Sequence, residues 1–126
     1  MTINDVIALV ERQCPGGIER AEQVRQISLL EKRIINEVLS HYPEAVYDRN
    51  FDSYDPDTDG SDVLLVPEPY SQMYVHYLLS QHYLMMLEQT HYNNQLYIFN
   101  SIYNDYKVHC IQTMRPDATY SRYRTR

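Results

Sequence analysis

Apolar residues recur every three or four positions over much of the chain, which is the spacing of one face of an α-helix. Near the start, Thr2 followed by Asp5 has the pattern of a reciprocal helix cap. The apolar face of this first predicted helix comprises Ile3, Val6, Ile7 and Val10. The run Cys14-Pro15-Gly16-Gly17 predicts the end of the helix, because proline and glycine interrupt helical backbone.

A second helix is predicted from about Glu22 to His41, and Pro43 closes it. Its apolar stripe comprises Val24, Ile27, Leu30, Ile34 and Val38. The residues assigned to its opposite, polar face are Arg25, Glu31, Lys32 and Glu37. A stripe of this kind predicts an amphipathic helix that packs one face against a core.

The longest helical pattern follows Pro67-Glu68-Pro69. The side chains predicted to face the core are Tyr70, Tyr74, Tyr77, Leu78, Leu84 and Met85, and those predicted to face outward are Gln72, Gln81 and Gln89. The stripe continues through Leu96, Phe99, Tyr103, Tyr106 and Cys110 to Met114, and Pro116 prevents simple continuation. We predict a break at Asn93-Asn94. The alternative is one uninterrupted helix from Tyr70 to Met114, because the stripe stays nearly in phase across the asparagines.

Residues 44–69 break the helical pattern with aspartate, proline, glycine and serine. They predict a long acidic loop, in which the apolar run Val63 to Val66 indicates a short strand or hairpin. Loops of this length in small domains are usually functional or mobile. The fold class is therefore all-α: a compact bundle of about four helices over residues 1–114, with this loop between the second and third helices. Residues 115–126 lack apolar side chains for packing and predict a flexible tail.

Charge separates the body from the tail. The net charge of the chain is −6, with seven Lys and Arg against sixteen Asp and Glu in residues 1–114. Residues 115–126 carry four arginines against one aspartate. An acidic body argues against a domain that binds nucleic-acid phosphates.

No apolar stretch approaches the length of a membrane span, so we expect a soluble protein made in the cytoplasm and no membrane partner. Cys14 and Cys110 predict two buried thiols rather than a disulfide.

The sharpest local motif is Asp55-Pro56-Asp57-Thr58-Asp59-Gly60, which matches the opening of an EF-hand calcium loop. The remainder of the motif fails, because position eight is Asp62 and position twelve is Val66 instead of a bidentate glutamate. We interpret it as a solvated acidic turn, with weak calcium binding as the alternative.

Glu88 and His91 lie one helical turn apart, as in half of a di-iron site. A second such pair is absent from the sequence, so we predict no metal site. His76 and His109 have no nucleophile or paired acid nearby and are interpreted as structural. The sequence therefore predicts no catalytic residue and no cofactor, and the chain is not expected to be an enzyme.

Aromatic residues are unusually rich in tyrosine, with thirteen Tyr, two Phe and no Trp. A tyrosine ring packs against apolar side chains while its hydroxyl reaches water or a polar group. The tyrosine stripe therefore predicts core and subunit-interface packing. A stacking platform for single-stranded nucleic acid would need basic neighbours, and here the neighbours are Glu, Gln and Asn. The tail combines residue types favoured in binding hot spots, although a merely solubilising end fits the same residues.

The order of these parts resembles the head-tail connector family of long-tailed bacteriophages and prophages. The residues that carry the likeness are the run from Pro67 to Leu78, then Glu88, Tyr92-Asn93-Asn94, Phe99-Asn100, Tyr103 to Tyr106 and Met114-Arg115-Pro116. The likeness covers most of the chain, including the short leading helix, the Glu31-to-Val38 segment and the acidic loop. The density of tyrosine and the arginine-rich ending depart from the family's pattern.

The resemblance implies a structural adaptor for head completion in the virion, assembled in the host cytoplasm. Such adaptors form a ring, typically a dodecamer, beneath the portal protein, extend the DNA channel without specific DNA binding, and receive a stopper or tail-completion protein. It implies binding roles for 113–126 and 52–66. The residues assigned to protein binding are Thr113, Arg115, Tyr120, Arg122, Tyr123, Arg124, Arg126, Asp55, Asp57, Asp59 and Asp62.

Two other functions remain open at the level of sequence. A small helical nucleic-acid-binding protein that uses its basic tail predicts DNA affinity that falls with salt. A metal-dependent enzyme of the helical-bundle type predicts stoichiometric iron, manganese or zinc in the purified protein.

Overall fold

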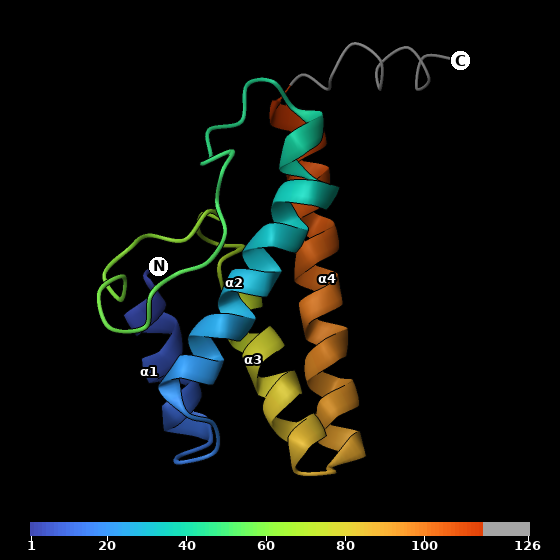
Figure 1. The fold of residues 1–126 in the computed structure, drawn as a ribbon. Coiled ribbons are helices and arrows are strands. Elements are labelled where there is room, and N and C mark those ends of the chain that lie inside the picture. The colour runs from blue at the N-terminus through green and yellow to red at the C-terminus, as the bar shows by residue number, and fades with distance from the viewer. Residues whose placement is uncertain (115–126) are drawn as a thin grey trace.

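The computed structural model describes residues 1–114, and the predicted all-α fold is confirmed over this range. The helices are α1 (Ile3–Gln13), α2 (Arg20–Glu37), a short 3-10 turn (Leu39–His41), α3 (Gln72–Met85) and α4 (Gln89–Thr113). Figure 1 shows α2 crossing the front of the α3–α4 pair, with α1 on the far side of α2 from α4. None of the helices in this part of the chain is long and apolar enough to span a membrane.

The predicted cap at the start of α1 is confirmed. The backbone N–H of Asp5 donates to the Thr2 hydroxyl over 3.1 Å, and the N–H of Thr2 donates to the Asp5 carboxylate over 3.0 Å. Each side chain thus satisfies an N–H that the first turn of a helix leaves without a partner. The helix ends at Gln13, just before the predicted Cys14-to-Gly17 breaker.

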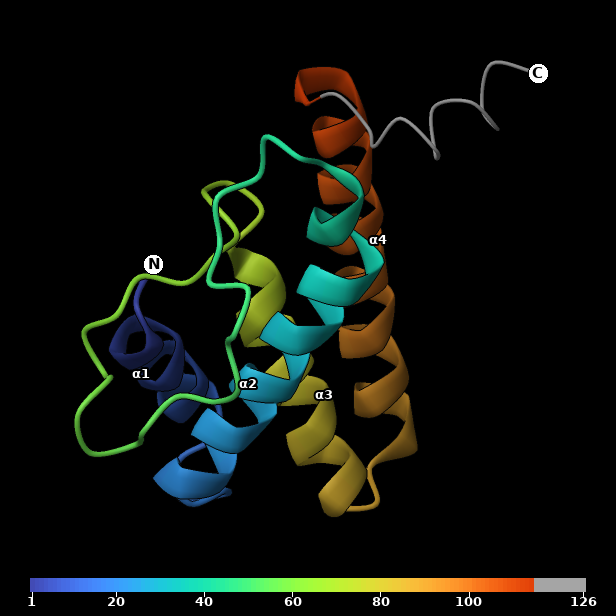
Figure 2. The same cartoon turned by 45° about the horizontal axis from the view of Figure 1, so that its top comes forward.

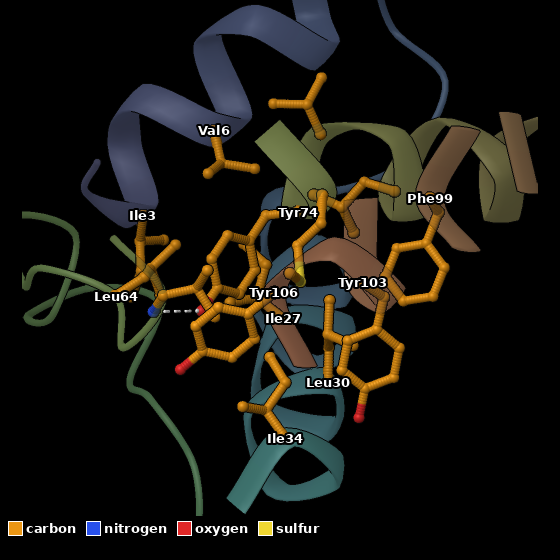
Figure 3. Packing of buried hydrophobic residues seen from close by; sticks show 14 of the residues in the cluster. Ile3, Val6, Ile27, Leu30, Ile34, Leu64, Tyr74, Phe99, Tyr103 and Tyr106 are labelled. Atoms are coloured by element: carbon orange, nitrogen blue, oxygen red, sulfur yellow. Dashed lines mark hydrogen bonds between the residues drawn. The ribbon is translucent and has the colours of Figure 1, made fainter. Parts of the chain in front are cut away.

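One hydrophobic core joins all four helices and the loop (Figure 3). The predicted stripes of α1 and α2 are buried, and so are Phe99, Tyr103, Tyr106 and Cys110 on α4. Polar heads of these side chains reach partners at the edge of the core. The Tyr103 hydroxyl donates to the Glu37 carboxylate over 3.1 Å, and the Arg33 guanidinium lies over the Tyr103 ring, which ties α4 to α2.

The predicted break at Asn93-Asn94 is wrong, because both asparagines lie inside α4. The chain reverses instead at Leu87, between α3 and α4, with φ at 59°. There the N–H of Glu88 donates to the Tyr83 carbonyl over 3.0 Å, and the N–H of Leu87 to the Leu84 carbonyl over 3.1 Å. This is the Schellman arrangement, which closes a helix by satisfying its last carbonyl groups.

The reversal at Leu87 also changes which side chains reach the core. Leu84 and Met85 were predicted to face the core, but both are exposed. They lie in the last turn of α3, beside the short turn that leads into α4 at the bottom of Figure 1. A helix pattern gives the face of a side chain, but not whether a neighbouring element covers that face.

The long loop predicted at 44–69 occupies the whole connection between the 3-10 turn and α3. Figure 2 shows it running from the end of α2, past the start of α1, and back to α3. The strand expected at Val63 to Val66 is reduced to one antiparallel bridge between Thr2 and Val63. The N-terminal segment supplies only this short partner, so no longer ladder forms in residues 1–114.

Candidate functional site

The loop is fastened to the helices by Glu31, the most deeply buried carboxylate in the described part of the chain. Glu31 was predicted on the polar face of α2, but its exposed fraction is 0%. Its carboxylate accepts hydrogen bonds from the Tyr74 hydroxyl of α3, the Tyr54 hydroxyl (2.9 Å) and the Leu65 N–H (3.1 Å). We call these four residues the Glu31 cluster.

The electrostatics of the Glu31 cluster follow from its burial. Loss of water raises the pKa of the Glu31 carboxyl, and the three hydrogen bonds, which favour the charged form, oppose the rise without cancelling it. Burial and the neighbouring carboxylate also raise the pKa values of Tyr54 and Tyr74. Both phenols therefore keep their protons and act as donors, which is the role that a buried carboxylate needs.

Further contacts hold the loop against α1 and the start of α2. Arg20 donates to the Pro56 carbonyl over 2.9 Å and to the Asn4 side chain over 2.7 Å. The N–H of Asn4 donates to the Gly60 carbonyl over 2.9 Å. A Cβ at Gly60 would meet the ends of the Asn4 and Arg20 side chains at 2.5 and 2.6 Å, so a larger residue there would have to displace these two polar groups. The loop is thus a fixed part of the surface.

The motif at residues 55–60 forms an acidic turn. Asp55 Oδ1 accepts the N–H groups of Asp57 and Thr58 over 2.7 and 3.2 Å, and Asp59 Oδ2 accepts the N–H of Asp55 over 2.7 Å. These carboxylates thus close the turn by hydrogen bonds to its own backbone. Within residues 1–114, no group of three or more His, Cys, Asp or Glu side chains is arranged to hold a metal ion.

A cavity of about 400 Å³ lies between the loop and the second half of α2, and we call it the loop pocket. Its lining combines acidic, aromatic and aliphatic side chains: Ile35, Asp48, Phe51, Ser53, Tyr54, Asp59, Asp62, Val63 and Leu65. The rings of Phe51 and Tyr54 pack at 4.8 Å, while Val63 remains 71% exposed. The pocket brings together two of the predicted site residues, Asp59 and Asp62, with apolar surface that the motif did not predict.

A second surface feature is the turn between α3 and α4. Four consecutive large apolar side chains are exposed there, at Leu84, Met85, Met86 and Leu87, and we call this segment the apolar tip. The exposed fractions of Met85 and Leu87 are 62% and 89%. Leucine is disfavoured at positive φ, because its Cβ crowds the backbone. Leu87 therefore strains the chain while its side chain packs against almost nothing in residues 1–114.

The predicted histidine sites are not assembled into a reactive group in the described residues. His91 lies 3.9 Å from the Glu88 carboxylate and stacks on Tyr83, both contacts lying at the surface. His76 pairs with the Gln95 side chain over 2.7 Å, and His109 packs against Tyr70. Each histidine thus has a separate local partner.

Thr113 is the last residue of α4, and its hydroxyl donates to the His109 carbonyl over 2.8 Å. The other predicted tail residues, Arg115, Tyr120, Arg122, Tyr123, Arg124 and Arg126, lie outside the described residues. The acidic turn lies beside α1, away from the C-terminal end of α4 (Figures 1 and 2). In the described part of the chain, Thr113 and the acidic turn are therefore separate.

Neither Glu31 nor Leu87 was predicted from the sequence as a functional residue. Glu31 lies four residues after Ile27 and three before Ile34, which is the spacing of the buried stripe, so its position could have been recognised. No comparable sequence signal marks Leu87.

No family model, no curated protein and no solved structure matches the chain.

Proposed function

We propose that the chain is a structural subunit of a phage head-tail connector. It forms a ring beneath the portal protein, extends the DNA channel and offers a docking surface for a stopper or tail-completion protein. Support comes from the order of its parts: a short leading helix, a second helix, an acidic loop, the Pro67-to-Tyr70 segment, and a pair of antiparallel helices. The role is structural, and the protein resides at the head-tail interface of the virion.

The observation that carries the assembly role is the apolar tip. Contiguous exposed apolar surface on a small protein marks a contact site, because removing apolar surface from water is favourable. Leu87 adds a second reason, since its positive φ would be relieved by glycine or asparagine at no loss of core packing. Leucine at this strained, exposed position is explained if its side chain is buried against another protein, because that burial offsets the strain.

Charge supports the placement along a DNA channel. Residues 1–114 have a net charge of −9, from seven Lys and Arg against sixteen Asp and Glu. A negative wall repels phosphates and allows a genome to slide past without binding. The arginines of 115–126 have the opposite sign and suit an acidic groove on the portal.

The test has a genetic and a biochemical step. The genes beside the one for this chain should encode portal, capsid and tail proteins. Heads filled with DNA should then retain the wild-type chain, as measured by gel analysis of purified particles. Leu87→Asn introduces a residue better suited to positive φ and removes the apolar side chain, so heads should lose this variant.

The matched control is Leu29→Gln, which removes an exposed leucine from α2 instead. This variant should be retained like the wild type. Normal retention of Leu87→Asn would remove the apolar tip from the interface. Failure of the wild-type chain to bind portal or heads would overturn the connector proposal.

A DNA titration distinguishes the connector proposal from the alternative, a nucleic-acid-binding protein that uses the arginines of 115–126. The alternative requires affinity that falls with salt with a log–log slope of up to about −3.6, since four arginines each contribute about −0.9 on duplex DNA. The connector proposal predicts no binding above that of an unrelated acidic protein at about 0.15 M salt.

A further inference from the structure

The loop pocket has a lining that a segment of this same chain matches in charge and in residue type. We infer that it is the docking site for the chain's own residues 115–126. This inference is independent of the proposed function, because both partners belong to one chain.

The first argument is charge complementarity. Asp48, Asp59 and Asp62 lie around the pocket, and none takes part in an ion pair within residues 1–114. The nearby Lys32 is paired with a different carboxylate, that of Asp52, over 2.9 Å. Residues 115–126 supply four arginines against one aspartate. Guanidinium groups bind carboxylates in a planar, two-bonded geometry, so they suit this rim better than lysines would.

The second argument is the apolar part of the lining. The Phe51 and Tyr54 rings form one wall, and the side chains of Ile35, Val63 and Leu65 complete it. Residues 115–126 contain two tyrosines, interleaved with the arginines. A tyrosine ring buries apolar area while its hydroxyl reaches a polar rim, which this half-acidic pocket provides. An acidic peptide or a phosphate group would be repelled by the same rim.

The third argument is reach. Lys107 and Ile111, near the end of α4, line a small cavity together with Glu37, the last residue of α2, and Val38, which follows it. Ile35 of the loop pocket lies within one helical turn of Glu37 and Val38, since a turn holds about 3.6 residues. A segment of twelve residues spans up to about 40 Å when extended. The chain that follows Met114 is therefore long enough to enter the pocket of its own subunit.

The consequence is a subunit whose basic segment is already occupied before assembly. A partner with a stronger acidic groove would have to displace it, and displacement would expose the pocket at the same time. In a connector ring, this exchange would couple release of the segment to docking on the portal.

The test is methyl NMR on the full chain at low salt. Nuclear Overhauser effects are expected between the tyrosine ring protons of Tyr120 or Tyr123 and the methyl groups of Ile35, Val63 and Leu65. The double variant Arg122→Glu with Arg124→Glu should abolish them and shift those methyl resonances. Adding Asp48→Lys and Asp62→Lys to that variant should restore them, because the charges are then exchanged.

The matched control is Arg12→Glu with Arg25→Glu, which changes the net charge equally on exposed positions of α1 and α2. It should leave the methyl contacts intact. Absence of these contacts in the wild type would overturn the inference, as would contacts that survive the tail variant. Contacts that vanish on dilution would assign the pocket to a second copy and overturn docking within one chain. All measurements use the isolated chain, so their failure leaves the connector proposal to its own test.

Discussion

At the scale of single residues, Glu31 contributes to the pH dependence of the fold's stability. Its pKa is raised in the folded state, so the folded chain binds a proton more tightly than the unfolded chain does. The stability linked to this group is fully present below the ordinary glutamate pKa of 4.5 and is lost as pH rises through the raised value. Tyr54, Leu65 and Tyr74 all donate to this carboxyl group, which favours its charged form and limits the rise of its pKa.

We predict that Glu31→Gln removes this response. The free energy of unfolding of the variant, relative to the wild type, should increase from pH 4.5 upward and become constant above the raised pKa. Urea unfolding at a series of pH values measures the difference. A difference that stays flat across this range would show that Glu31 titrates normally.

Glu22→Gln is the control with the opposite sign. The Arg25 guanidinium lowers the pKa of Glu22, so its stabilising effect is present above 4.5 and is lost as pH falls. The free energy of unfolding of Glu22→Gln should therefore lie below that of the wild type at neutral pH and approach it in acid.

At the scale of elements, the turn between α3 and α4 depends on one left-handed residue. A leucine in this conformation destabilises the fold by about 1–2 kcal/mol. Glycine removes this strain, but it also gives the unfolded chain more conformational freedom, which offsets about 0.4–1 kcal/mol of the gain in stability. We predict that Leu87→Gly raises the free energy of unfolding by about 0.5–1 kcal/mol. Chemical denaturation followed by far-UV circular dichroism measures the change.

Met85→Gly provides the comparison, two residues earlier in right-handed helix. It should lower the stability by about 1 kcal/mol, the usual effect of glycine inside a helix. Equal effects of the two glycines would contradict the assignment of strain to Leu87.

At the scale of the whole molecule, residues 1–114 share one core. Side chains from all four helices pack with Ala45, Leu64 and Val66 of the loop, so the loop cannot leave without opening that core. We predict a single unfolding transition. Far-UV circular dichroism, which follows helices, and near-UV circular dichroism, which follows the tyrosines, should give the same midpoint. A near-UV change that precedes helix loss would show that the loop and its tyrosines unfold separately.

The sequence by itself determined the helices that begin and end on local signals. The reciprocal cap of Thr2 and Asp5, the breaker after Gln13 and the stripes of α1, α2 and α4 all depend on neighbours within a turn or two. Interactions this local are encoded in residue order, and the all-α class followed from them.

The tertiary structure alone decided where α3 ends and which groups donate hydrogen bonds to the buried Glu31 carboxylate. The stripe stays in phase through residues 84–96, so periodicity could not choose between Leu87 and Asn93; the packing of α4 back along α3 selects the reversal at Leu87. The donors to Glu31 lie 23, 34 and 43 residues further along the chain. A carboxylate is stable inside a core only when such distant partners converge on it, and that convergence exists only in the folded chain.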